Sequence, residues 1–270
     1  MKINYKSIAY WVLSLIIMLS AYTYQKVTGP TYPVSGEVEI NGQVYEYKLP
    51  RTSDEDEFQI VELTIPDKSV SGTFIWKRYK SHDTLIYQPM ERQGDKLIGK
   101  IPHQPPAGKV QYDIVLQTKN GQKINLTEKS IVLRYKGKVP LYWLLPHIFF
   151  MFFGFWFALR TGIEAVAKGN NLLQLTLLTT ILLFFGGIIL GPIVQKYAFD
   201  AFWTGWPFGH DLTDNKTLVA FIMWLVALWK LRKNSENRKW VIIAALVTLA
   251  VFIVPHSVLG SEIDYTKIQQ

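Results

Sequence analysis

The amino-acid sequence predicts an α-helical membrane bundle of five transmembrane helices joined to an all-β domain outside the cytoplasm. Two observations predict this fold class. Five mostly uncharged apolar stretches come near the roughly 20 residues that a helix needs to cross the hydrocarbon core of a bilayer. The region between the first two stretches, residues 26–138, instead alternates apolar and polar residues between turn signals, which is the pattern of short β-strands.

The apolar stretches define the predicted helices, because a chain in lipid must satisfy its own backbone hydrogen bonds. They are residues 7–25, 139–159, 169–195, 217–229 and 240–261. The fourth stretch is short, and it spans only if Lys216 and Lys230 at its ends extend toward the interfaces. Residues 139–261 are therefore expected to form a four-helix bundle. Its third helix contains Gly191-Pro192, where proline frees a carbonyl and predicts an irregular helix.

The distribution of lysine and arginine predicts the orientation. With the N-terminus in the cytoplasm, basic residues of the short segments concentrate on the inner side. Residues 26–138, the loop 195–216 and the tail 262–270 then lie outside the cytoplasm. Residues 1–25 also have features of a signal peptide, but Ser20-Ala21-Tyr22 is a poor cleavage site. We therefore interpret them as an uncleaved anchor in the cell (inner) membrane.

Composition excludes several classes of protein. The chain has no cysteine, which removes disulfides, thiolate metal sites and cysteine nucleophiles. The net charge of +8 comes from 29 Lys and Arg against 21 Asp and Glu. Because the excess lies beside the apolar stretches, it predicts a lipid bilayer and no nucleic acid as a partner.

Residues 34–135 are expected to form about eight short strands. Asn41-Gly42 and Asn120-Gly121 each separate two alternating runs. Asn-Gly is a strong hairpin signal, because both central residues of the tight turn need a positive φ. The pattern predicts a β-sandwich.

One part of this domain resembles a known family. Residues 90–97 read Met-Glu-Arg-Gln-Gly-Asp-Lys-Leu, and residues 101–112 read Ile-Pro-His-Gln-Pro-Pro-Ala-Gly-Lys-Val-Gln-Tyr. Together they resemble the strand–turn–strand run of bacterial immunoglobulin/fibronectin-type-III-like accessory domains. The resemblance implies an immunoglobulin-like interaction module and carries no catalytic residue.

The loop 195–216 is rich in aromatic residues. Phe199, Phe202, Trp203 and Trp206 have helical spacing and predict a short interfacial helix. The alternative is a lid over a pocket. Asp211 is predicted to cap the following helix.

Three histidines are expected to converge near the outer leaflet. Pro146-His147 and Pro255-His256 lie in helices of opposite direction, and His210 lies in the outer loop. Ionisable groups inside spans often mark function. Imidazoles with carboxylates suit a transition metal, so the candidate metal ligands are His147, His210, His256, Asp211 and Glu262. Alternatively, His147 and His256 hold a b-type haem as cofactor, or each imidazole bonds a carbonyl that a proline frees.

Three functions remain open. The first is a non-enzymatic accessory, scaffold or assembly protein, whose β-domain contacts another membrane or periplasmic protein. The second is a metal- or haem-binding membrane protein. The third is an enzyme or transporter with a pocket under the aromatic loop. The sequence contains none of the phosphate-binding, metalloprotease or serine-hydrolase motifs, which favours the first function.

Overall fold

The computed structural model describes residues 5–267 except 55, 257 and 259. The chain forms two compact units. We call residues 1–30 and 139–260 the helical unit, and residues 31–138 with the tail from residue 261 the β-unit. The all-β region therefore lies between the first two helices in the sequence, and the tail belongs to the same unit as the strands.

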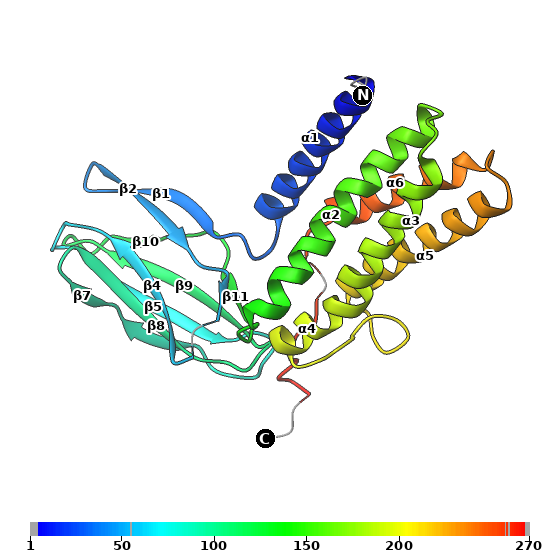
Figure 1. The fold of residues 1–270 in the computed structure, drawn as a ribbon. Coiled ribbons are helices and arrows are strands. Elements are labelled where there is room, and N and C mark those ends of the chain that lie inside the picture. The colour runs from blue at the N-terminus through cyan, green and yellow to red at the C-terminus, as the bar shows by residue number, and fades with distance from the viewer. Residues whose placement is uncertain (1–4, 55, 257, 259, 268–270) are drawn as a thin grey trace. The chain divides into compact units, whose positions relative to one another are not determined.

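The helical unit contains long apolar helices (Figure 1). Four are long and apolar enough to cross a membrane: α1 (Tyr5–Thr28), α2 (Leu141–Val166), the continuous helix of α3 (Leu172–Leu183), η1 (Phe184–Leu190) and α4 (Gly191–Phe199), and α5 (Leu212–Lys233). Exposed apolar side chains on α1 recur at Ile8, Val12, Ile16 and Leu19. A stripe with this spacing is suited to contact with lipid.

The fifth predicted span is shorter than the sequence suggested. The helix α6 (Arg238–Ile253) has 16 residues and a length of roughly 24 Å. It ends before Pro255, and Val254 takes an extended conformation. A residue before proline is pushed out of the helical region by the proline ring. The expected helix over residues 240–261 therefore stops eight residues early.

The third helix is irregular, as Gly191-Pro192 predicts. The segment η1 is a π-helix in which the N–H of Gly191 donates to the carbonyl of Gly186. A Cβ on Gly186 would lie 2.9 Å from Phe150 Cβ, and one on Gly187 would lie 2.6 Å from a methyl of Thr217. These glycines therefore let η1 approach both α2 and α5 closely.

Trp224 of α5 is the centre of packing between the last helices. It is fully buried, and its indole N–H donates to the hydroxyl of Thr248 on α6 at 2.8 Å. Ala158, Ala227 and Ala244 surround it in one cluster. Small residues at helix contacts let backbones approach, which is how helices associate within lipid.

Within its described residues, the β-unit contains eleven short strands; most are labelled in Figure 1. They are β1 (Val34–Ile40), β2 (Gln43–Leu49), β3 (Thr52–Ser53), β4 (Phe58–Thr64), β5 (Ser71–Arg78), β6 (Ile86–Pro89), β7 (Glu91–Gln93), β8 (Lys96–Pro102), β9 (Lys109–Gln117), β10 (Lys123–Asn125) and β11 (Ile131–Tyr135). The six-stranded sheet has the order β3-β11-β9-β5-β6, with β10 on β9, and β3 runs parallel to β11. The three-stranded sheet has the order β4-β8-β7, and β1 pairs with β2.

The sheets share one apolar core. Phe74 on β5 and Tyr112 on β9 stack with ring centroids 5.4 Å apart, and both are fully buried beside Val61 of β4. Gly99 on β8 makes room for this pair, because a Cβ there would lie 2.6 Å from the Phe74 ring. The alternating sequence therefore produces sheets with one buried face, as predicted.

Both predicted hairpins form. Asn41 and Gly42 have φ values of 52° and 79° and connect β1 to β2. Gly121 has a φ of 80° between the paired strands β9 and β10. In the first turn both asparagine and glycine take this left-handed region, as the two-residue turn requires. In the second only Gly121 does, and the connection is longer, from Gln117 to Lys123.

Candidate functional site

His147 is engaged within the helical unit. Its Nδ1 donates to the carbonyl of Gly186 at 2.9 Å. That carbonyl belongs to η1, where the helix is irregular. This carbonyl also accepts the N–H of Gly191, so it is not one that a proline frees, and the imidazole bonds the backbone in another way than the sequence suggested. A neutral ring that donates from Nδ1 keeps Nε2 as an acceptor.

His256 lies near several other polar side chains. This imidazole lies within electrostatic range of Lys216, His147 and Asp211. Lys216 comes from the first turns of α5, and its ammonium donates to the carbonyl of Val254 at 2.6 Å. The structure thus brings together three of the predicted site residues and adds a lysine that the sequence analysis treated only as a boundary of a span.

The other two candidate ligands lie elsewhere. His210 is exposed in the loop before α5. Glu262 belongs to the β-unit, where its carboxylate pairs with Lys80 and Lys109. Among the residues that the structure describes, no group of three or more His, Asp or Glu is arranged to hold a metal ion. The predicted site of five ligands is therefore divided, and metal or haem binding through His147 and His256 is an alternative that only measurement on the purified protein tests.

We expect the purified protein to contain no stoichiometric zinc, iron, copper or nickel and no haem. The physical reason is Lys216, because an ammonium beside His256 repels a cation placed on the same imidazole. Elemental analysis and a visible spectrum test this expectation. Bound metal or a Soret band that disappears in both His147→Ala and His256→Ala, but persists in His210→Ala, would contradict it.

Asp211 caps α5, as predicted. Its carboxylate accepts the N–H groups of Thr213 at 2.8 Å and of Asp214 at 3.4 Å. These amides have no partner within the first turn of a helix, and a negative charge at this end also suits the helix dipole. The role of Asp211 is therefore structural in this structure.

Asp214 organises the aromatic loop. One oxygen of its buried carboxylate accepts the N–H of Thr204 at 2.7 Å, the N–H of Gly205 at 3.0 Å and the side-chain amide of Gln195 at 3.0 Å. The neighbouring Asn215 accepts the N–H of Trp206 at 2.6 Å. The start of α5 therefore fixes the path of residues 204–206.

The predicted interfacial helix is wrong beyond Phe199. The helix α4 ends there, and Asp200 takes a left-handed conformation with a φ of 61°. The loop amides then bond to Asp214 and Asn215 instead of to carbonyls one turn back. Helical spacing of aromatic residues therefore did not decide the local structure, because side-chain acceptors on the next helix satisfy the backbone.

Several aromatic side chains of this loop are exposed. Trp206 is 69% exposed and Phe208 is 83% exposed. Lys196 pairs with Asp200 and lies 5.8 Å from the ring centre of Phe202. Aromatic rings and lysine at the end of candidate spans are typical of the membrane–water interface.

The helix α2 contains a buried ion pair that was not among the candidate residues from the sequence. Nη1 of Arg160 lies 2.8 Å from the carboxylate of Glu164, and the two side chains are only 3% and 7% exposed. The guanidinium also lies 5.3 Å from the ring centre of Trp11 on α1. The spacing of four residues between opposite charges was the signal that could have identified this pair.

Glu164 also shapes the turn after α2. Its carboxylate accepts the N–H of Asn171 at 3.2 Å. A Cβ on Gly169 would lie 2.0 Å from the carboxylate, so any other residue there would displace the Glu164 side chain from its present position. Arg238 at the start of α6 donates to the carbonyl of Gly169 at 3.0 Å. This network joins α1, α2, α3 and α6 through one buried charge pair.

Comparisons with known protein families, with curated proteins and with solved structures find no match to this chain.

Proposed function

We propose that this protein is an integral membrane accessory or scaffold protein whose β-unit, an immunoglobulin-like module by its sequence resemblance, binds another protein outside the cytoplasm. The observation that carries the proposal is an open apolar edge of the six-stranded sheet. Strand β6 pairs with β5 within the described residues, and its other edge has no strand beside it. Leu85, Ile86 and Tyr87 follow one another there and are all exposed.

The hydrogen bonds of β6 support binding of an extended segment. The N–H of Met90 donates to the carbonyl of Gly72, which continues the register of β5 and β6. Because antiparallel ladders alternate, the backbone groups of Tyr87 face away from β5. An unpaired edge with apolar side chains is a common place for a partner's strand to add to a sheet. Pro89, which lacks an N–H, limits such pairing to the first part of β6.

The internal contacts of the helical unit also favour a scaffold over an enzyme. Asp214 bonds to the loop, Glu164 to Arg160, and Lys216 to Val254. With Asp211, which caps α5, these are the buried charged groups of the described helical unit, and each binds a neighbouring helix or loop through hydrogen bonds or, for Arg160 and Glu164, an ion pair. Buried charges that are paired within the fold are typical of structural networks.

Site-specific photo-crosslinking in intact membranes tests the partner surface. We expect a photoreactive residue at Tyr87 of the full chain to crosslink to one protein, whereas the same residue at exposed Lys119 does not. With the photoreactive residue kept at position 87, Ile86→Lys should abolish the product, because a charge on an edge strand opposes pairing. Equal crosslinking at positions 87 and 119, or none at 87, would overturn the proposal.

We further propose that α6 also crosses the membrane. The protein then has five spans in an inner membrane, with its N-terminus on the cytoplasmic side. The support comes from the tail. Residues of the tail pair with strands of the β-unit, as in Glu262 with Lys109 and Ser261 with Arg134. Both ends of the segment between residues 138 and 261 therefore need the same side of the membrane, which requires an even number of crossings. Helices α2, α3–α4 and α5 supply three, and α6 is the fourth.

Single-cysteine labelling tests this topology, since the chain has no cysteine of its own. We expect a membrane-impermeant maleimide added to intact cells to label Lys119→Cys and Lys267→Cys but not Glu236→Cys. All three positions are exposed, and all should label after the membrane is opened. Protection of both 236 and 267 while 119 is labelled would contradict the even number of crossings, and labelling of 236 alone would reverse the proposed orientation.

A further inference from the structure

The tail of the β-unit, residues 261–267, is bound along its length by the strands' own residues. Arg134 donates to the carbonyl of Ser261 at 2.6 Å, and the N–H of Ile263 donates to the carbonyl of Ala107 at 3.2 Å. Glu262 pairs with both Lys80 and Lys109. The tail is thus held by backbone and charge contacts, as an extended peptide is held in a binding site.

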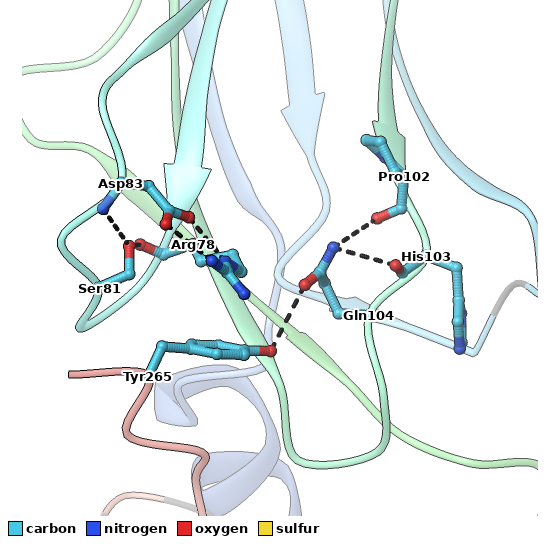
Figure 2. Close-up of polar contacts among 7 residues, drawn as sticks. All are labelled: Arg78, Ser81, Asp83, Pro102, His103, Gln104 and Tyr265. Carbon is cyan, nitrogen blue, oxygen red and sulfur yellow. Dashed lines mark hydrogen bonds and ion pairs between the residues drawn. The ribbon is translucent and has the colours of Figure 1, made fainter. Parts of the chain in front are cut away.

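Tyr265 provides the second anchor of the tail (Figure 2). The guanidinium of Arg78 lies 4.7 Å from the centre of its ring, and its hydroxyl donates to Oε1 of Gln104 at 3.4 Å. A Cβ on Gly108 would lie 2.8 Å from this hydroxyl, so glycine leaves the space that the phenol fills. Stacking of arginine on tyrosine and a hydrogen bond together select an aromatic phenol.

The residues that receive Tyr265 are held in place by contacts of their own. Asp83 binds Arg78 through two hydrogen bonds of 2.7 and 2.8 Å, and Gln104 donates to the carbonyls of Pro102 and His103 (Figure 2). The Arg78 pair lowers the pKa of Asp83 and keeps it ionised. Such preorganisation reduces the entropy that a peptide loses when it binds.

The turn that contacts Ile263 has an unusual backbone. Ala107 has a φ of 66°, which is uncommon for a residue with a Cβ. Its N–H donates to the carbonyl of Tyr135 on β11, and its carbonyl accepts the N–H of Ile263. Strained residues of this kind concentrate at binding sites.

We propose that this surface of the β-unit, formed by Arg78, Lys80, Lys109 and residues 104–108, is a peptide-binding site for an extended segment in which a glutamate precedes a tyrosine by three residues. The chain's own tail occupies the site, and a partner protein with a segment of the same chemistry takes it when the tail leaves. The existence of such a partner depends on the proposed accessory function, whereas binding of the tail to this surface does not. The tail is thereby a tethered competitor of the partner.

The charges around Glu262 support the selection of an acid. Lys80, Lys109, Arg78 and Arg134 all lie on the receiving side, and Asp83 neutralises only Arg78. Partial burial acts to raise the pKa of Glu262, but its hydrogen bonds with Lys109 and Lys80 lower it on balance. Because binding lowers the pKa of Glu262, the ionised carboxylate stabilises the bound state at pH values above 4.5, its ordinary pKa. This stabilisation is lost as the pH falls through the lowered pKa. Asp264 and Tyr79 are the other titratable groups near Lys80.

Binding of a labelled peptide tests the proposal. The probe is Ser-Glu-Ile-Asp-Tyr-Thr-Lys, which copies residues 261–267. A tethered tail has an effective concentration of about 1 mM, so it should weaken the apparent affinity of a peptide with a Kd of about 10 µM by roughly 100-fold. We expect the chain truncated after Gly260 to bind the probe at least about 10-fold more tightly than the full chain does. Probes with Gln for Glu or Ala for Tyr should bind more weakly than the original.

Two further variants keep the test decisive. If truncation lowers the thermal midpoint, the full chain with Glu262→Gln and Tyr265→Ala serves as the open form. Lys109→Gln should remove binding to the open form, whereas Lys119→Gln, at an exposed turn, should not. Absence of binding to a folded open form, or equal binding to the open and full chains, overturns the proposal. Peptide binding with no crosslink at Tyr87 would instead overturn only the proposed partner at β6.

Discussion

Replacement of Glu164 by glutamine is expected to destabilise the helical unit by about 3 kcal/mol, because it leaves the charge of Arg160 buried without its counterion. The side chain of Arg160 is only 3% exposed. Its Nε forms no hydrogen bond with the described residues, so other contacts compensate little for the lost carboxylate. The measurement is the thermal midpoint of the purified full chain in detergent, followed by circular dichroism.

A double variant separates the charge from the shape of the site. Arg160→Met with Glu164→Leu removes both charges, and it should be more stable than Glu164→Gln alone, since an apolar pair of similar volume often replaces a buried ion pair without loss. Glu236→Gln is the matched control, because Glu236 is exposed in the turn before α6. A Glu164→Gln midpoint equal to that of the control would show that Arg160 does not depend on its partner.

The ion pair also shows what the sequence could predict about the helices. The apolar runs predicted the four long helices, but they ended the second one at Leu159. Beyond that residue, α2 continues to Val166 because Glu164 neutralises Arg160 within the fold. Counting charges one at a time overlooks such compensation, since the cost of burying a charge depends on its partner.

In the β-unit, too, the sequence predicted a local feature, a turn, but did not predict a contact between distant residues. Asn41-Gly42 predicted its hairpin because the required φ values are a local property. The pairing of Glu262 with Lys80 and Lys109 joins positions more than 150 residues apart, and no spacing rule describes it. The five candidate metal ligands are divided for this reason, since Glu262 folds with the strands.

Replacement of Asp214 by alanine is expected to release the aromatic loop from α5, with a loss of about 3 kcal/mol. Its carboxylate accepts the backbone amides of Thr204 and Gly205 and the side chain of Gln195. Hydrogen bonds to a charged acceptor contribute about 1.5–3 kcal/mol each, and buried donors left without partners add a penalty. Alanine removes every acceptor at once, whereas asparagine keeps one neutral oxygen and should lose less.

Hydrogen exchange of the loop amides is the direct measurement. In Asp214→Ala, the amides of Thr204 and Gly205 should exchange faster than in the unchanged chain, while the indole N–H of Trp224, buried against α6, should not. Asp200→Asn is the matched control, because this loop carboxylate is 79% exposed and pairs with Lys196 in the same turn. If the two variants exchange alike, the loop is held by its aromatic side chains. In that case the start of α5 does not determine the path of the loop. Exposed rings such as Phe208 would then have to order the loop by binding elsewhere.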